Sequence, residues 1–234
     1  MTITRLHPSP LGPLDVDDDE TWVQLAELYA LAGPEVIRVN MIASVNGSAV
    51  GDDGSSESLS NRVDRKILGI IRRAADVVVV GAETVRREGY LSPAHSTLAV
   101  VTSSGDLSGH RLEDSPLPPL ILCPADAAER VKRELTGIPH TIALLESEDL
   151  DAEEIVHALR SAGLRSIVCE GGPTLAAAFI DAGVVDELCL TTSPRLHSPG
   201  TPMLGRVDAM PRATLEQLLV DDESTLYARW RLGR

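Results

Sequence analysis

The chain has few aromatic side chains, few cysteines and little positive charge for its 234 residues. Its three cysteines, Cys123, Cys169 and Cys189, lie apart in apolar surroundings, which predicts buried, reduced thiols rather than disulfides or a zinc site. The 21 basic and 35 acidic residues give a net charge of −14. Nucleic acids and anionic membranes attract basic surfaces, so neither is an expected partner. No apolar run approaches the roughly 20 residues of a membrane span.

The signatures of several large enzyme classes are also missing. The sequence contains no Gly-x-Gly-x-x-Gly of a Rossmann dinucleotide site, no P-loop, no Gly-x-Ser-x-Gly elbow and no His-Glu-x-x-His. The six histidines do not have the spacing of metal ligands, so no metal site is expected. Residues 1–14 contain prolines and no hydrophobic signal core. Export is therefore not indicated, and the cytoplasm is the expected location.

The composition is that of a globular protein, with 43% apolar residues. Short β-branched runs alternate along the chain with patterns typical of helices. This alternation, without repeats or a linker, predicts an α/β domain with a mixed, mainly parallel sheet. We expect strands at 36–44, 76–81, 98–102, 120–123, 141–145, 167–169 and 185–192, and a terminal hairpin at 215–220 and 226–230. Residues 1–34 are expected to form an N-terminal extension, an extended arm and then a helix, before a main domain of residues 35–234.

The most informative stretch begins at Glu170, where a short buried strand is expected to end. Gly171 and Gly172 follow, and Pro173 suits the first turn of a helix. The unpaired N–H groups of a helix N-terminus attract anions, and glycine lets a phosphate approach the backbone. Glu170 would face the same crevice, where open α/β sheets bind ligands. An ordinary tight turn between a strand and a helix accounts for these residues equally well.

Small and hydroxyl residues end three other expected strands, at 43–44, 81–84 and 102–104. If these strands are parallel, their carboxyl ends meet at one edge of the sheet. Two glycine turns and several hydroxyls at one edge suit a phosphate-rich nucleotide. From the residues alone, the chain is an α/β protein that binds a nucleotide-like anion, with its chemistry open.

Four motifs in order extend this interpretation: residues 39–47, residues 76–86 with a Val-Gly-Ala-x-Thr-Val turn, residues 170–175 and residues 185–188. Together they resemble the pyrimidine reductase family of riboflavin biosynthesis, the reductase half of the bifunctional deaminase-reductase. The zinc deaminase motif is absent from this sequence. The resemblance implies a dihydrofolate-reductase-like three-layer sandwich, NADPH as cofactor and a homodimer. It also implies the activity of a 5-amino-6-(5-phosphoribosylamino)uracil reductase, with hydride transfer to the ribosyl carbon of this phosphoribosylaminopyrimidine.

The resemblance also implies roles for individual residues. Cofactor contacts are expected at Ala43, Gly81, Thr84, Ser103, Ser104, Gly171, Gly172, Thr174 and Leu175, with the two serines near the adenosine 2′-phosphate. Arg72 and Glu88 are expected on the substrate side, and Glu170 and Asn46 at the catalytic positions. For two of these residues a simpler role is also open: Arg72 could be a last-turn cation that stabilises the helix dipole, and Glu88 could be a solvated side chain.

Asn46 is a departure from the family, whose first motif usually reads Ser-Leu-Asp-Gly and often continues with lysine. This chain has Ser-Val-Asn-Gly-Ser at 44–48, and an amide cannot carry a titrating proton. An arginine usual after the second turn is also missing, with His95 near its place. The sequence therefore leaves two alternatives to the riboflavin substrate: a reductase of a dihydrofolate-like ring, and an NADPH-binding protein without catalysis.

Overall fold

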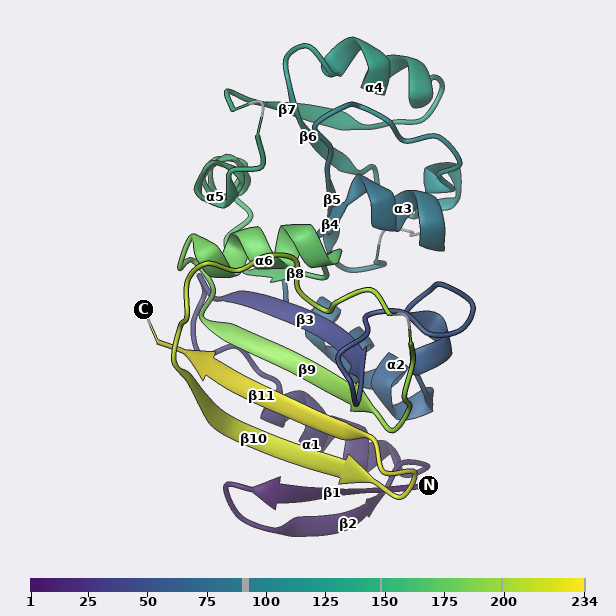
Figure 1. Cartoon of the computed structure of the whole chain (residues 1–234), viewed down its shortest axis with the longest axis vertical. Coiled ribbons are helices and arrows are strands. Elements are labelled where there is room, and N and C mark those ends of the chain that lie inside the picture. Colours follow the sequence, from purple (N-terminus) through teal and green to yellow (C-terminus); the bar gives the residue numbers. More distant parts are fainter. Residues whose placement is uncertain (90–92, 148, 199, 234) are drawn as a thin grey trace.

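The computed structural model describes residues 1–89, 93–147, 149–198 and 200–233, and they form one mixed sheet of 11 strands. The strand order is β2-β1-β10-β11-β9-β3-β8-β4-β5-β6-β7 (Figure 1). The strands are β1 Thr2–His7, β2 Leu11–Asp15, β3 Ile37–Ser44, β4 Val77–Gly81, β5 Thr97–Val101, β6 Leu120–Pro124, β7 Thr141–Leu145, β8 Ile167–Cys169, β9 Glu187–Ser193, β10 Ala213–Asp221 and β11 Leu226–Leu232. From β9 to β7 all neighbouring strands pair parallel, and the remaining pairs are antiparallel, which confirms the predicted mixed, mainly parallel sheet.

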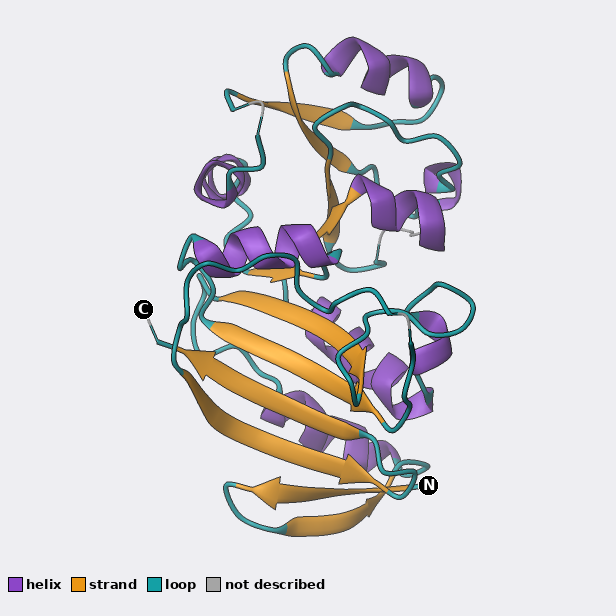
Figure 2. Cartoon of the chain, viewed as in Figure 1, coloured by secondary structure: helices purple, strands orange, loops and turns teal. Residues whose placement is uncertain are grey.

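Helices cover both faces of the sheet and complete the three layers (Figure 2). The helices are α1 Asp19–Leu28, α2 Arg62–Arg73, α3 Ala82–Glu88, α4 Ala128–Glu134, α5 Ala152–Ser161 and α6 Pro173–Asp181, with short 3₁₀ turns η1 Glu57–Leu59 and η2 Leu112–Asp114. Helices α5 and α6 pack on one face, and α1 to α4 pack on the other.

The valines of β4 show why the central strands are apolar throughout. Val77 and Val79 pack against α5 and α6, whereas Val78 and Val80 pack against α3 and α4. A parallel strand with helices on both faces has no solvent side, so its sequence does not alternate. The three cysteines are free and buried, as predicted.

Helix α2 begins at Arg62, directly after an asparagine cap. The N-cap is Asn61, whose side chain accepts a hydrogen bond from the Asp64 N–H at 2.9 Å. Ser60 donates its hydroxyl to the Asp64 carboxylate at 2.7 Å. The Asp64 side chain is therefore held by a hydrogen bond in the first turn of α2.

The prediction of an extended arm at the N-terminus was wrong, because these residues form two strands of the main sheet. Strand β1 pairs antiparallel with β10 at the edge of the sheet, and β2 pairs with β1 (Figure 1). Ile3 and Val16 are buried in the same core cluster as Leu25 of α1. Prolines at positions 8, 10 and 13 interrupt the strand pattern, so the sequence concealed it. Within the described residues, no helix is long and apolar enough to cross a membrane.

Candidate active site

A cleft of about 1010 Å³ opens near the carboxyl ends of β3, β4 and β8. One wall consists of the loop at residues 49–60 and of α2. The other wall consists of the first turns of α3 and α6. Pockets that bind small molecules or cofactors are commonly of about 300–1,000 Å³, so this cleft has room for a cofactor end and a substrate ring together.

The two glycine turns meet at the cleft, as the sequence predicted. The Gly81 N–H donates to the Gly171 carbonyl at 2.8 Å, which joins the end of β4 to the turn after β8. Gly81 at the end of β4 and Thr84 of α3 line the cleft on one side of this junction. Gly172, just before α6, and Thr174 and Leu175 of α6 line it on the other. The first-turn N–H groups of α6 therefore open onto the same space.

Gly171 and Gly172 face different surroundings. Gly171 has a φ of +83°, and a Cβ there would stand 2.9 Å from the Met41 sulfur. Gly172 has a φ of −62°, and its Cβ would lie 3.4 Å from the Thr84 hydroxyl. The backbone and packing thus require glycine at 171, whereas the space beside residue 172 belongs to the cleft. Gly171 itself is outside the described cleft lining.

Arg72 and Glu170, which are 98 residues apart, form a bidentate ion pair in the cleft. Arg72 Nε lies 2.8 Å from Glu170 Oε1, and Nη2 lies 2.7 Å from Oε2. The Glu170 side chain is only 6% exposed. Burial alone would lower the pKa of Arg72, but the Glu170 carboxylate outweighs it and the pKa is raised. The bidentate pair fixes the end of α2 against the residue that follows β8.

Asp64 is a cleft residue that the sequence interpretation did not select. It shares one face of α2 with Leu68 and Arg72, and all three line the cleft. Burial raises the pKa of Asp64, an effect that the hydroxyls of Thr191 and Ser60 partly offset. The four-residue spacing of these positions on a helix next to Arg72 is the signal that would have identified it.

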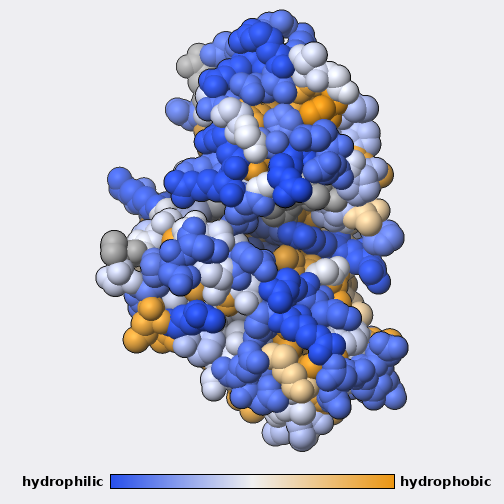
Figure 3. Space-filling model, turned by 90° about the vertical axis from the view of Figure 1, so that its right-hand side faces the viewer, coloured by the Kyte–Doolittle hydropathy of each residue, from blue (hydrophilic) through white to orange (hydrophobic). Residues whose placement is uncertain are grey.

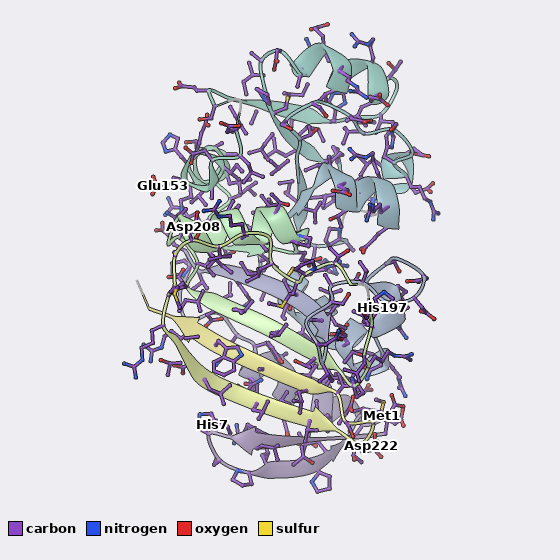
Figure 4. All side chains as sticks on the ribbon, in the orientation of Figure 1. Met1, His7, Glu153, His197, Asp208 and Asp222 are labelled. Atoms are coloured by element: carbon purple, nitrogen blue, oxygen red, sulfur yellow. The ribbon has the colours of Figure 1, made fainter. Side chains whose placement is uncertain are left out.

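Asn46 lies on the exposed turn after β3 and outside the described lining of the cleft. Its Nδ2 donates to the His197 carbonyl at 2.8 Å, and its Oδ1 accepts from the His197 N–H at 3.0 Å. The Ser44 hydroxyl donates to the same oxygen at 2.8 Å. The Asn46 amide therefore holds the loop that carries His197 by two hydrogen bonds (Figure 4). This geometry gives no support to a catalytic role of Asn46, which stays a prediction. Ala43, buried in β3, is also outside this lining.

Ser103 and Ser104 are exposed after β5 and do not belong to the described cleft lining. Ser104 Oγ accepts a hydrogen bond from the Asp106 N–H at 3.3 Å. Two cations contact Asp106: Arg86 donates to its carbonyl at 2.7 Å, and Arg130 lies 3.1 Å from its carboxylate. These arginines were not selected from the sequence, because nothing in their spacing brings them to this turn.

Glu88 lines the cleft at the end of α3 and is bound to the opposite wall. Its carboxylate accepts hydrogen bonds from the Ser56 hydroxyl at 2.9 Å and the Ser56 N–H at 3.3 Å. The exposed side chain is therefore not simply solvated. It connects the loop at 49–60 to α3 across the cleft.

Carboxylates outnumber cations among the described residues that line the cleft. Each of the three lining arginines is paired with a carboxylate: Arg65 with Glu57 at 2.8 Å, Arg72 with Glu170 at 2.7 Å and Arg87 with Glu83 at 3.1 Å. Asp53, Asp64 and Glu88 are the further acidic residues of the lining. The surrounding surface is largely hydrophilic (Figure 3). Across the described part of the chain, no cluster of three His, Cys, Asp or Glu side chains is arranged to hold a metal ion.

The sequence matches known proteins over most of its length. Residues 35–225 match the sequence model of the RibD C-terminal domain. The riboflavin biosynthesis protein RibD of Bacillus amyloliquefaciens is 24% identical over 178 residues, which cover 72% of this chain and 48% of that protein. The chain thus spans about half the length of the curated relatives it matches.

Solved structures share the architecture. A pyrimidine reductase-like protein from Corynebacterium diphtheriae superposes with a TM-score of 0.78 at 25% identity, covering 90% of this chain and 99% of that one. Dihydrofolate reductase from Enterococcus faecalis, solved with NADP(H), has a TM-score of 0.51 at 13% identity, covering 87% of this chain and 100% of that one. The second likeness concerns the fold alone, and it confirms the predicted dihydrofolate-reductase-like sandwich.

Proposed function

The chain belongs to the RibD C-terminal domain family, and from that membership we propose that it is an NADPH-dependent pyrimidine reductase of riboflavin biosynthesis. It would transfer hydride to the ribosyl carbon of a phosphoribosylaminopyrimidine. The observation that carries this proposal is the pair of glycine turns, which the Gly81 to Gly171 hydrogen bond joins at the edge of one cleft.

The residues of these turns fit a dinucleotide. Gly172 leaves the space in front of the α6 N-terminus open, and a helix N-terminus with adjacent glycine suits a pyrophosphate. Gly81, Thr84, Thr174 and Leu175 line the same space. NADPH would supply the hydride, and these residues would bind and orient it. Ala43 and Gly171 lie outside the described lining, and their cofactor contacts stay part of the proposal.

The turn at Ser103 and Ser104 is the proposed place of the adenosine 2′-phosphate. Its hydroxyls are donors, and Arg86 and Arg130 stand beside it through their contacts with Asp106. Charge-assisted hydrogen bonds contribute about 1.5–3 kcal/mol each, so this turn would favour NADPH over NADH clearly.

The wall of α2 and the loop at 49–60 is the proposed substrate side. Arg72 and Glu88 would contact the substrate there, with Glu170 holding Arg72 in place as well as facing the reacting end. A homodimer in the cytoplasm that binds no nucleic acid completes the proposal, as the family resemblance and the net charge of −14 suggest.

Equilibrium titration with NADPH and NADH tests the proposal, followed by an NADPH oxidation assay with the phosphoribosylaminopyrimidine. We expect NADPH to bind at least about tenfold more tightly than NADH, a difference of about 1.4 kcal/mol. Absence of NADPH binding at millimolar concentration would refute the proposal. Equal affinity for both cofactors would refute the placement of the 2′-phosphate.

A reductase of a dihydrofolate-like ring is a second candidate, and one observation favours it. The three arginines of the described lining are each engaged by a carboxylate, so a sugar phosphate would have to draw one of them away from its partner. The same oxidation assay, run with a phosphate-free pterin, distinguishes the two. NADPH binding without turnover of either substrate would favour a protein without catalysis.

A further inference from the structure

The loop at 49–60 has internal hydrogen bonds that make its tip a compact unit. The Asp53 carboxylate accepts hydrogen bonds from the Ser55 N–H and the Ser55 hydroxyl, each at 2.8 Å, and from the Ser58 hydroxyl at 2.7 Å. The Gly51 N–H donates to the Ser55 carbonyl at 3.0 Å. Local bonds of this kind hold a surface loop in one shape, so we expect the tip at 51–58 to move as one body.

Both ends of this tip are held on one side of the cleft. Ala49 is buried and donates its N–H to the Thr201 carbonyl at 2.7 Å, and Leu59 is buried at the other end. Between these ends, Glu57 pairs with Arg65 of α2 at 2.8 Å. These two side chains are 70% and 52% exposed, and exposed ion pairs contribute little. The ion pair therefore holds the tip to α2 only weakly.

Ser56 connects the tip to the opposite wall of the cleft. Glu88 follows 32 residues later, at the end of α3, and its Oε1 accepts the Ser56 hydroxyl at 2.9 Å and the Ser56 N–H at 3.3 Å. Both residues line the cleft. In Figure 1 the loop between β3 and α2 lies on the side of α2 that faces α3. In the described part of the chain, the hydrogen bonds between the tip and α3 all go to this one carboxylate oxygen.

A hydrogen-bonded link between two walls of a cleft has to break before the walls can separate. Ser56 is half-buried and Glu88 is exposed. Water replaces each partner when such a link breaks, so the net cost of breaking it is small. The link therefore opens and closes readily. Loops that open and close over a binding site commonly set the rates at which ligands enter and leave.

We propose that the contact between Ser56 and Glu88 is a latch that holds the loop at 49–60 across the cleft, and that ligands enter and leave the cleft while the latch is open. The inference rests on the proposed function only in its probe, NADPH. Both Ser56 donors go to Glu88 Oε1, so the second carboxylate oxygen keeps acceptor positions for the proposed substrate contact.

Three serine substitutions separate the latch from the general order of the loop. Ser56→Ala removes the hydroxyl donor of the latch and leaves Glu88 unchanged. Ser56→Thr keeps a hydroxyl at the same position and is the conservative control. Ser58→Ala is the matched control, because it removes a hydroxyl donor at 2.7 Å from Asp53 inside the loop instead of one across the cleft.

Hydrogen exchange followed by mass spectrometry tests the latch without any ligand. Ser56→Ala should raise the exchange rates on both sides of the cleft, at residues 54–60 and 83–89, by at least about threefold. Ser58→Ala should change the loop alone, and Ser56→Thr should exchange like the wild type. Unchanged exchange of α3 in Ser56→Ala would overturn the proposal, because the two walls would then not be linked. If Ser56→Ala fails to fold, Glu88→Ala replaces it in this experiment, with the same expected and contradicting results.

Stopped-flow fluorescence with NADPH tests whether the latch controls ligand exchange. The association and dissociation rate constants should both rise at least about threefold in Ser56→Ala, with Kd within twofold of the wild type. The equilibrium is unchanged because the latch joins the two walls and not the ligand. Ser56→Thr and Ser58→Ala should keep the wild-type rates.

Unchanged rate constants in Ser56→Ala would overturn the proposal. A weaker Kd caused by faster dissociation alone would overturn it too, because Ser56 would then contact the ligand directly. A failure of the proposed function has a different signature, namely no NADPH binding to any of the four proteins. The hydrogen exchange of α3 then decides by itself whether the latch exists.

Discussion

Gly171 and Gly172 are neighbours in the chain, yet different constraints act on them. Residue 171 needs a positive φ and has the Met41 sulfur 2.9 Å from where a Cβ would stand. Residue 172 has an ordinary φ of −62° and free space toward the cleft. The fold therefore requires glycine at 171, whereas glycine at 172 is required only by the proposed pyrophosphate site.

Gly172→Val should therefore fold and bind NADPH at least about tenfold more weakly, because its side chain enters the proposed pyrophosphate space. Gly171→Ala is the contrasting variant, and it should lower the melting temperature because it strains the backbone and the Met41 contact. Fluorescence titration and thermal melts measure the two effects. Wild-type NADPH affinity in Gly172→Val would contradict the assignment.

Asn46→Asp gives the second prediction at this scale. The substitution removes the Nδ2 donor and brings a carboxylate oxygen toward the His197 carbonyl, so the melting temperature should fall. Because Asn46 lies outside the described cleft lining, kcat/KM should change by less than about threefold. General acid catalysis is typically worth roughly 10²–10⁴ in rate, so a proton-delivery role would instead show a rise of tenfold or more.

The sequence predicted correctly that several residues line the cleft, but it did not predict the side chains with which they form ion pairs or hydrogen bonds. Arg72 and Glu170 were both selected, but their mutual ion pair spans 98 residues and depends on how β8 meets α2. Glu88 was expected either to contact the substrate or to be solvated, and its bond to Ser56 matches neither role fully. Local patterns contain no information on such distant contacts, which arise only when the elements pack.

The carboxylate of Asp76 connects strands β4 and β8 at their N-terminal ends. Asp76, just before β4, accepts hydrogen bonds from the Arg165 and Ser166 N–H groups, each at 2.9 Å. The two strands were predicted correctly, because continuous β-branched runs between glycine-rich turns are typical of parallel strands. Strands β1 and β2 were missed because proline interrupts their short patterns.

Asp76 predicts a pH dependence of stability. The backbone N–H of Ser166, chiefly, holds the pKa of Asp76 below its ordinary value of 3.8. Because folding lowers this pKa, the ionised carboxylate stabilises the folded state at pH values above the pKa that Asp76 has in the unfolded chain. This stabilisation is lost as the pH falls through the pKa of the folded state. Asp76→Asn should melt below the wild type at pH 7, and the difference should shrink at pH 3. A difference that does not change between these pH values would contradict the role of the ionised carboxylate.

The whole molecule depends on its first 16 residues more than an N-terminal extension would suggest. Strand β1 pairs with β10, and Ile3 and Val16 are buried with Leu25 and Tyr227 in one cluster. The expected boundary between an N-terminal extension and the main domain at residue 34 stays a prediction. This core cluster contains residues from both sides of that boundary. The cleft lies on the part of the sheet between β3 and β4, apart from this edge.

Deletion of residues 1–16 should destabilise the fold without affecting the proposed cofactor site. Burial of two aliphatic side chains such as Ile3 and Val16 contributes about 3–6 kcal/mol. For a domain of this size, that loss lowers the melting temperature by roughly 6–24 °C. Differential scanning calorimetry measures it, with NADPH affinity below the transition as the control. A truncated chain that melts like the full chain would show that β1 and β2 are dispensable.

Hydride transfer from NADPH to the ribosyl carbon of the pyrimidine substrate is the central step proposed for this chain. The direct measurement uses NADPH labelled with deuterium at C4, in each of its two stereoisomers, and follows the label by mass spectrometry and NMR of the product. We predict that one isomer delivers its deuterium to C1′ of the product and that the other does not. Product without deuterium from either isomer, while NADPH binding is intact, would contradict hydride transfer to that carbon.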